Sequence, residues 1–270
     1  MTNLGGGTFR VLLSLNALVL IAVTLASGSA FAQGFKWPEE PENLQVLPEG
    51  TGGAQLGKIM RGFASSLGVR CEHCHVGEGP DLTQFDFPSD EKATKLKARL
   101  MIAMVTALNQ EHLPKLSEIE DREKPILQVE CMTCHRSLSR PVMLGDVLSA
   151  TIESEGVDAA IAEYRDLRDE YYGGFSYDFS EGMLTGLGEQ LGDDGDFESA
   201  IRLIELEIEM NGESAAILYT LGGVQAAADL TIDAIDSFSN GMDMAPNDWK
   251  PFFQSELDRL TNRLEQGEDP

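Results

Sequence analysis

Apolar residues recur at helical spacing in the first half of the chain. Within residues 54–67 they fall three or four positions apart, as on one face of a helix, at Leu56, Met60, Phe63 and Leu67. Gly68 follows directly and predicts the end of this helix, because glycine is a common helix terminator. Residues 34–53, with three prolines and a Gly-Gly pair, predict an extended lead-in before it.

A second, longer helix is predicted after the loop of residues 76–90, with Ser89 as its N-terminal cap. Its outer face is expected to carry a basic group consisting of Lys92, Lys95, Lys97 and Arg99. Its inner face is expected to carry a stripe consisting of Met101, Met104, Val105, Leu108 and His112. The charged residues 115–124 are then expected to form a loop.

The pattern changes after Gly145. Ala-Ile pairs occur at 160–161, 200–201 and 234–235, and Leu-Gly pairs at 187–188 and 221–222. The last Ala-Ile interval and the Leu-Gly interval are both 34 residues, which is the period of tetratricopeptide repeats. This half therefore resembles an array of tetratricopeptide-like helical hairpins, with residues 248–264 as a final helix that covers its exposed end.

The N-terminal segment predicts export. The positive charge of Arg10 precedes an apolar run at residues 11–26, and Ala30 and Ala32 form an A-x-A cleavage site. The run is short for a membrane span, which needs roughly 20 residues. We expect residues 1–32 to be a secretory signal peptide of a periplasmic protein, with retention as an N-terminal anchor as the alternative.

Negative charge is concentrated in the second half of the chain. Residues 1–150 contain 14 basic and 17 acidic residues, whereas residues 151–270 contain 6 and 28. A net charge of −25 argues against nucleic acids and anionic membrane surfaces as partners. An acidic surface maintains solubility and is suited to attract basic protein partners.

The four cysteines lie in two copies of one pattern, which are Cys71-Glu-His-Cys74-His75 and Cys131-Met-Thr-Cys134-His135. Cys-x-x-Cys-His is the attachment sequence of c-type haem. Two thiols three positions apart can each bond one vinyl group of the macrocycle, and the adjacent histidine can then bind the iron. The motifs therefore predict two covalently attached haem c groups, with His75 and His135 as proximal ligands.

Two other uses of these cysteines fit the sequence less well. The Cys-x-x-Cys pairs of a zinc ribbon are about 15–20 residues apart, whereas 56 residues separate Cys74 from Cys131. A pair of disulfides suits an oxidising compartment but leaves both trailing histidines unexplained. His73, between the two bonded cysteines of its motif, is expected at the surface and not at the iron.

The distal ligands stay open on spacing alone. Met60 lies on the apolar face of the helix that leads into the first motif, although a methionine in such a position is most often part of the core. Met101, Met104 and His112 share the stripe of the second helix, and each is a candidate ligand of the second haem.

Residues 43–143 resemble the cytochrome c subunit of photosynthetic reaction centres. The resemblance lies in the stretches LPEGT, IMRGFASSLGVRCEHCH, PSDEKATKLKARLMIAMVTALNQEHL and VECMTCHRSLSRP. That family is built from helix–turn–CxxCH units, normally with four haems, and its axial methionines lie on the helix before each motif. The resemblance implies Met60 and Met101 as the two distal ligands, with Met104 in a non-ligand position. His112 does not align with the histidine that binds one haem of the family.

Three features differ from that family. Two haem motifs are present where the family normally has four, and the repeat-like half is not part of the reaction-centre subunit. Ser137 follows the second motif where the family usually has glycine.

The prediction is an all-α protein, in which helix–turn–CxxCH units are followed by a tetratricopeptide-like hairpin array. Its expected divisions are the signal peptide (1–32), the lead-in (33–53), a dihaem cytochrome c domain (54–145) and a helical repeat region (146–270). The expected function is one-electron transfer through two His/Met-ligated haems, similar to the subunit that re-reduces the photo-oxidised special pair of a reaction centre.

Two other functions are considered. A dihaem peroxidase-type enzyme would need a five-coordinate iron with distal acid–base groups, and a docking or assembly protein would carry its haems as a side feature. The expected partners are redox proteins, either a reaction centre or a small soluble cytochrome. The acidic repeat region is a candidate docking surface, and membrane association is expected only through a partner or an uncleaved signal.

Overall fold

The computed structural model of the protein describes residues 35–119 and 127–267, and the regular structure within these ranges is helical. Apart from one isolated bridge between Val76 and Asp86, these ranges contain no paired strands. The predicted all-α class is confirmed. No helix in the described part of the chain is long and apolar enough to cross a bilayer. The predicted signal peptide lies outside the described residues.

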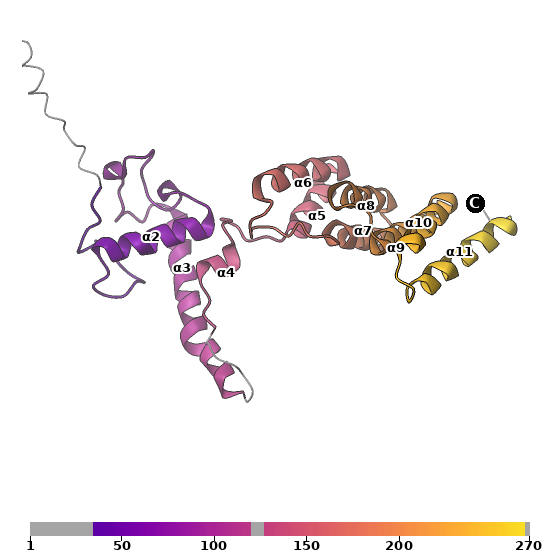
Figure 1. Ribbon diagram of the computed structural model, residues 1–270. Coiled ribbons are helices and arrows are strands. Elements are labelled where there is room, and N and C mark those ends of the chain that lie inside the picture. Colours follow the sequence, from indigo (N-terminus) through magenta and orange to yellow (C-terminus); the bar gives the residue numbers. More distant parts are fainter. Residues whose placement is uncertain (1–34, 120–126, 268–270) are drawn as a thin grey trace, which may run out of the picture.

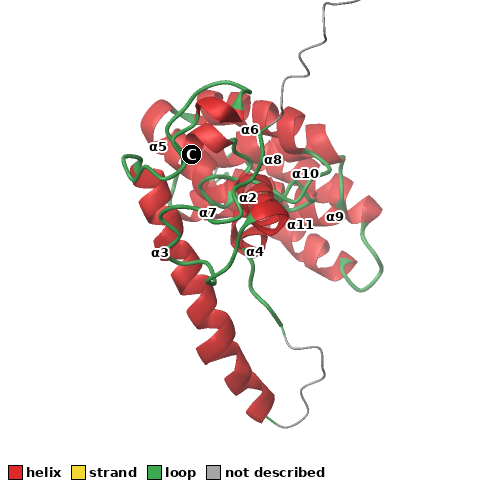
Figure 2. Ribbon diagram, turned by 90° about the vertical axis from the view of Figure 1, so that its left-hand side faces the viewer, coloured by secondary structure: helices red, strands yellow, loops and turns green. Residues whose placement is uncertain are grey.

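Three α-helices organise the first part of the structure: α2 (Gly53–Leu67), α3 (Ala93–Ala107) and α4 (Cys131–His135). α3 continues into a π turn at Leu108–His112 and a 3₁₀ helix at Leu113–Glu118. Figure 2 shows α3 projecting away from the other helices, with the chain returning towards α4. The long arm formed by α3 therefore leads from the region of the first cysteine motif to the segment before the second.

The helix predicted over residues 54–67 is confirmed as α2, and it ends where the sequence indicates. Gly68 has a left-handed φ of 65°, and its amide donates to the carbonyls of Ala64 and Ser65. Glycine suits this capping position because it has no Cβ to oppose a positive φ. The chain then turns sharply out of α2 and reaches Cys71 within three residues.

The lead-in packs against α2 and the loop that follows the first motif. The ring of Phe35 lies 5.2 Å from those of Trp37 and Phe87, and the rings of Phe85 and Phe87 stack at 5.5 Å. A Cβ at Gly57 of α2 would come within 2.7 Å of the Trp37 indole nitrogen. This aromatic cluster links α2 to the loop, so the lead-in contributes to the core of the first part.

The second part contains seven helices that succeed one another along an elongated array (Figure 1): α5 (Leu144–Glu155), α6 (Val157–Tyr171), α7 (Met183–Asp193), α8 (Phe197–Asn211), α9 (Ala215–Ala227), α10 (Thr231–Met244) and α11 (Lys250–Glu265). α5 packs with α6, α7 with α8, and α9 with α10, and α11 follows against α10. The final helix predicted over residues 248–264 is confirmed as α11.

Small residues allow the paired helices to pack closely, and they repeat at the predicted step. α8 begins at Phe197 and α10 begins 34 residues later at Thr231. Ala160, Ala200 and Ala234, the first residues of the three Ala-Ile pairs, are completely buried. A Cβ at Gly188 would come within 2.7 Å of Ile204, and one at Gly222 within 3.0 Å of Phe238. The hairpins thus share one packing pattern, while their tetratricopeptide assignment stays a prediction.

A buried carboxylate holds α7 against α8. Glu207 of α8 is fully buried and accepts hydrogen bonds from the amides of Gly182 and Leu184, at 3.2 and 2.9 Å. The side chain of Asn211 donates to it as well, at 2.6 Å. These amides belong to the N-terminal end of α7, where backbone N–H groups lack helical partners and favour a negative charge. Glu207 therefore caps the neighbouring helix.

The two parts of the structure meet at a hydrogen bond between Ser176 and Arg136. The Ser176 hydroxyl, in the segment between α6 and α7, donates to the Arg136 carbonyl at 2.8 Å. Ser176 is held in a segment with aromatic residues, in which Tyr177 contacts Tyr171 and Phe179 with ring centroids 5.3 and 6.2 Å apart. Arg136 directly follows His135 of the second cysteine motif. The helical array therefore contacts the first part of the structure at the residue next to His135.

Candidate functional site

The first cysteine motif is wound into a tight turn. A 3₁₀ turn spans Cys71–His73, and the amides of Cys74 and His75 both donate to the Cys71 carbonyl, at 3.2 and 2.9 Å. In 3₁₀ geometry, residues three positions apart lie on the same side of the backbone. The Cys71 and Cys74 thiols are therefore presented together, as two thioether bonds to one macrocycle require.

The first turn of α3 fixes this motif in place. The ammonium group of Lys92 donates to the Glu72 carbonyl, and the Thr94 hydroxyl donates to the His73 carbonyl. His73, expected at the surface, is half-buried in this contact region. The N-terminal end of α3 thus positions a loop that lies about 20 residues earlier in the chain.

The ring of His75 packs edge-on against Phe87, with ring centroids 5.0 Å apart. Its Nδ1 atom is buried without a hydrogen-bond partner among the described residues. Burial lowers the pKa of His75, nearby Lys95 lowers it further, and the backbone of Phe87 opposes these effects. The lowered pKa favours the neutral imidazole, which is the form that binds a metal ion.

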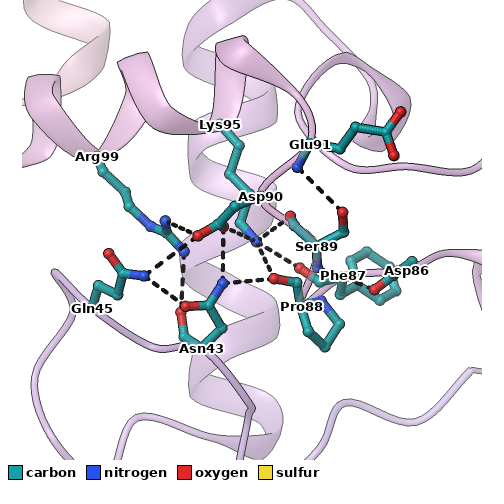
Figure 3. Close-up of polar contacts among 10 residues, drawn as sticks. All are labelled: Asn43, Gln45, Asp86, Phe87, Pro88, Ser89, Asp90, Glu91, Lys95 and Arg99. Atoms are coloured by element: carbon teal, nitrogen blue, oxygen red, sulfur yellow. Dashed lines mark hydrogen bonds and ion pairs between the residues drawn. The ribbon is translucent and has the colours of Figure 1, made fainter.

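Lys95 and Arg99 of α3 hold the loop that carries Phe87 (Figure 3). The Lys95 ammonium group donates to the carbonyls of Phe87, Pro88 and Ser89 at 2.8, 3.0 and 2.7 Å. It also forms an ion pair with Asp90 at 3.1 Å, and Arg99 forms a second one at 2.9 Å. This cluster fixes the backbone of the ring that contacts His75.

The lead-in segment takes part in the same cluster (Figure 3). The Asn43 side-chain amide donates to the Pro88 carbonyl at 2.6 Å and to the Asp90 carboxylate at 2.8 Å. The hydrogen bond from Arg99, and then that from Asn43, holds the pKa of Asp90 well below its ordinary value. Asp90 thus stays ionised at neutral pH and joins the lead-in, the loop and α3.

Two predictions for α3 are wrong in this region. Lys92, Lys95 and Arg99 were expected on a solvated outer face, but they are half-buried against loop carbonyls and carboxylates. Ser89 does not cap α3, which begins at Ala93 after Lys92; its hydroxyl accepts from the Glu91 amide at 3.2 Å instead. The backbone of this loop is irregular and does not supply hydrogen-bond donors to the carbonyls of residues 87–89. The Lys95 side chain of α3 therefore turns inwards and donates to these carbonyls.

The second cysteine motif forms a short helix of its own, α4. Its start is closed by a capping box in which the Glu130 amide donates to the Thr133 hydroxyl at 3.0 Å and the Glu130 carboxylate accepts from the Thr133 amide. At its end, Nδ1 of His135 lies 2.8 Å from the Leu138 carbonyl. A carbonyl can only accept, so Nδ1 donates in this contact, and Nε2 is the ring nitrogen that stays available to a metal ion. His135 is thereby prepared to bind iron through Nε2.

The turn after the second motif packs directly on the end of α2. Arg136 and Ser137 both have positive φ, 49° and 66°. The Ser137 amide donates to the Ser66 carbonyl at 2.9 Å, and its hydroxyl donates to the Ser65 carbonyl at 3.2 Å. The left-handed backbone of Ser137 explains why a glycine would fit this position. The contact joins the turn after the second cysteine motif to the helix that leads into the first.

Asn109 sets the position of the segment that enters the second motif. Its side-chain amide donates to the Val129 carbonyl, and its side-chain oxygen accepts from the Val129 amide, both at 2.8 Å. This paired contact aligns the chain before Cys131 with the end of α3. We did not identify Asn109 from the sequence. The available signal was a polar residue directly after an apolar helical run, and this signal does not indicate a partner.

The α3 face expected to point inwards is largely exposed. Met101 and Met104 are each 49% exposed, His112 is exposed, and Leu100 beside Met101 is 72% exposed. Of the predicted stripe, Val105 and Leu108 are half-buried, and the half-buried Ala98 and Ile102 share the packed side of α3 with Val105. The sequence could not distinguish these faces because α3 is apolar on most of its circumference. Met60 is half-buried on α2.

No disulfide joins any two of the four cysteines in the structure. Burial raises the pKa of Cys74, opposed by a hydrogen bond with Thr94 and by Lys92. Burial also raises the pKa of Cys131, and Glu130 and Cys134 raise it further.

The residues present fit haem c. Each motif presents two thiols and an imidazole on one short turn; His75 is held by burial against Phe87, and His135 by the Leu138 carbonyl. The exposed apolar side chains of Leu96, Leu100, Met101 and Met104 on α3 form a surface of the kind that an apolar macrocycle covers.

Comparison with known proteins agrees with this donor set. Residues 54–151 match the model of the photosynthetic reaction centre cytochrome C subunit family. The match supports assigning this segment, and not the whole chain, to the reaction-centre cytochrome c family. Cytochrome c-554 of Chloroflexus aurantiacus is similar to this reaction-centre cytochrome segment, with 33% identity over 96 residues. The match covers 35% of this chain but 20% of that relative, so the chain spans about a fifth of the relative's length.

The matched segment contains both cysteine motifs, α2 to α4 and the beginning of α5. Membership of a cytochrome c family implies covalently bound haem c, and Cys71, Cys74, Cys131 and Cys134 are the described residues able to attach it. Most of the array, beyond residue 151, lies outside the match.

Proposed function

We propose that this protein is a periplasmic dihaem cytochrome that transfers electrons one at a time between redox proteins. The supporting observation is the pair of Cys-x-x-Cys-His motifs, each wound into one turn and joined through the contact between Ser137 and α2. In this proposal each motif carries one haem c, and the iron of each haem changes between the ferrous and ferric states. Membership of the cytochrome family favours a carrier over an enzyme.

His75 and His135 would serve as the proximal ligands, and Met60 and Met101 as the distal ones. Proximal binding is supported by the neutral state of His75 and by the Nδ1 contact of His135. A thioether ligand favours ferrous iron and raises the reduction potential relative to a second nitrogen ligand. With both axial positions filled, substrate has no open coordination position, which suits electron transfer and opposes peroxidase chemistry.

Met101 is preferred to Met104 because of the resemblance to the reaction-centre subunit. The two side chains are equally exposed on α3, one helical turn apart. The assignment therefore needs a comparison of both variants. His112 lies in the π turn beyond α3, farther along the arm than either methionine.

Replacement of the methionines tests the proposed ligands. We expect Met60→Ala to lower the potential of one haem and Met101→Ala to lower that of the other, each with a high-spin ferric signal at the altered iron. Met104→Ala is the matched variant on α3, and Met143→Ala provides an exposed control near the second motif. Redox titration with optical and electron paramagnetic detection measures both effects.

Particular outcomes would contradict the ligand assignment. Unchanged potentials in Met60→Ala would show that Met60 binds no iron, and a shift in Met104→Ala but not in Met101→Ala would exchange their roles. Rapid carbon monoxide binding or peroxide turnover by the wild-type protein would indicate an open coordination position and favour the peroxidase-type alternative.

The partners and location form the second part of the proposal. Export of the chain by residues 1–32 would place the haems in the periplasm, where a reaction centre or a small soluble cytochrome is the expected redox partner. The acidic array, with its 34-residue step between α8 and α10, would be a tetratricopeptide-like docking module. Truncation before α5 tests this role: docking is contradicted if the cytochrome segment alone exchanges electrons with its partner equally fast.

A further inference from the structure

Two adjoining pockets form a groove on one side of the array. The first, of about 200 Å³, is lined by residues of α7 and α9, including Glu189 and Asp193. The second, of about 300 Å³, is lined by α9 and α11, including Trp249 and Phe252. Tyr219 and Thr220 of α9 line both pockets, so the pockets adjoin. This groove runs across three successive odd-numbered helices, which Figure 1 shows following one another along the array.

One end of the groove is aromatic and exposed. Phe252 is 62% exposed, Trp249 44% and Tyr219 36%. Tyr219 is supported from below by the buried rings of Phe238 and Phe253, with centroids 5.5 and 5.1 Å away. Clustered exposed aromatic side chains commonly mark an interaction surface, and a ring held by packed neighbours loses little entropy on binding.

The other end of the groove is acidic, and so is the surface around it. Glu189 and Asp193 are exposed at the first pocket. Residues 151–270 contain 28 acidic and 6 basic residues, and four of these cations are in ion pairs with carboxylates. A fifth, Arg168, lies over the ring of Tyr172 at 4.2 Å. Few cations therefore remain to neutralise the acidic excess near the groove.

We infer that the groove binds an extended segment of a partner protein, in which a bulky apolar residue is followed by lysine or arginine. The apolar residue would enter the pocket beside Trp249 and Phe252, and the cations would lie near Glu189 and Asp193. A second copy of this chain is a poorer occupant, because both arrays carry the same strong negative charge. This inference extends the docking role proposed above and does not depend on the haem ligands.

Fluorescence anisotropy with defined peptides tests the inference on the full-length haem protein. The probe is a fluorescein-labelled peptide with a central Trp-Leu pair flanked on one side by four lysines. One comparison peptide replaces the lysines by glutamates, and another replaces the Trp-Leu pair by alanines. We expect the lysine peptide to bind best, with an affinity that falls as salt is added.

Variants in the groove should weaken binding, and matched variants on α10 should not. We expect Phe252→Ser to raise the Kd of the lysine peptide about tenfold or more, whereas Ile232→Ser, at an equally exposed position outside the groove, leaves it unchanged. The double variant Glu189→Gln/Asp193→Asn should raise the Kd severalfold at low salt. Its matched control is Asp233→Asn/Asp236→Asn, where two exposed carboxylates of α10 are neutralised.

A large side chain introduced at Gly223, which lines the first pocket, provides an independent test because it would fill the groove. A Cβ at Gly223 would meet no heavy atom within 4 Å, so Gly223→Arg adds a long side chain at a point of the groove wall where its Cβ has space. Replacing glycine in a helix also favours folding, so loss of binding in this variant would not result from unfolding. We expect Gly223→Arg to abolish binding of the lysine peptide.

Several results would overturn the inference. They are failure of the wild-type chain to bind the lysine peptide, equal binding of all three peptides, and equal Kd values for Phe252→Ser and Ile232→Ser. Sedimentation that shows a wild-type dimer and a Phe252→Ser monomer would identify a second copy as the occupant. Because these variants leave the haem motifs intact, the redox titration of each reports separately on the proposed electron-transfer function.

Discussion

The contact between Gly68 and Ser137 joins the segments that carry the two cysteine motifs, and Gly68→Ala is expected to disrupt it. A Cβ at Gly68 would lie 2.0 Å from the Ser137 carbonyl oxygen, far inside van der Waals contact. Since that atom belongs to the backbone, it cannot move aside by a change of rotamer. The turn that carries Ser137 must therefore shift away from α2.

The cost of this change can be assembled from two contributions. The left-handed φ of 65° at Gly68 costs a residue with a Cβ roughly 1–2 kcal/mol. The shift of Ser137 lengthens its hydrogen bonds to Ser65 and Ser66, each with a net contribution of about 0.5–1.5 kcal/mol. Gly68→Ala should thus lower the free energy of unfolding by roughly 2–5 kcal/mol.

Gly62→Ala is the matched control on the same helix. A Cβ at Gly62 meets no heavy atom within 4 Å, so alanine there should stabilise α2 by about 0.5–1 kcal/mol. Thermal unfolding followed by circular dichroism should show a decrease in Tm of about 5–15 °C for Gly68→Ala and a slight increase for Gly62→Ala. Redox titration should also show an altered second haem in Gly68→Ala, because Leu138, which binds His135, moves with Ser137.

A specific result would refute this reasoning. If Gly68→Ala unfolds at the same temperature as Gly62→Ala and keeps both reduction potentials, the two motifs are not joined through this contact. A decrease in stability with unchanged potentials would restrict the role of the contact to the protein fold and separate it from the second haem.

Two further predictions concern carboxylates. The pKa of Asp90 is lowered in the folded protein, so its contribution to stability is present above about pH 4 and decreases as the pH falls further. Denaturation measured between about pH 2 and 7 should therefore show a wild-type advantage over Asp90→Asn that is largest near neutral pH and shrinks in acid; a pH-independent difference would contradict the role of its charge. Glu207→Gln should lower the free energy of unfolding by about 2–4 kcal/mol, because a buried carboxylate with three donors is replaced by a neutral amide. The exposed Asp233→Asn should change it by less than about 0.5 kcal/mol in the same urea titration, and an equal effect of the two variants would show that Glu207 does not cap α7.

The sequence predicted the elements whose signals are local. The apolar spacing of residues 54–67 and the glycine after them predicted α2 and its end. The repeated Ala-Ile pairs predicted a series of helices beyond Gly145, and the structure buries the alanine of each pair. The Cys-x-x-Cys-His motifs predicted the attachment residues, and the structure winds each motif into one short turn. In each case the residues that determine the structure lie within one helix or one motif.

The sequence failed where the partner lies far away in the chain. Lys95 and Arg99 look like solvated charges on a helix, but the carbonyls and the carboxylate that they contact belong to the loop before α3. The faces of α3 could not be distinguished because apolar residues occur on both. Asn109 and Ser176 form their main contacts with residues 20 and 40 positions away, which no local pattern encodes.

The short connection between the second motif and the array has a kinetic consequence. Eight residues separate His135 from the start of α5, and Ser176 ties the array back to the turn that follows His135. A molecule captured by the array would therefore remain tethered near that end of the cytochrome after each unproductive collision. Tethering over short distances produces millimolar effective concentrations. Even a low affinity of the array for its partner would therefore allow repeated collisions between the partner and the cytochrome segment before the partner dissociates.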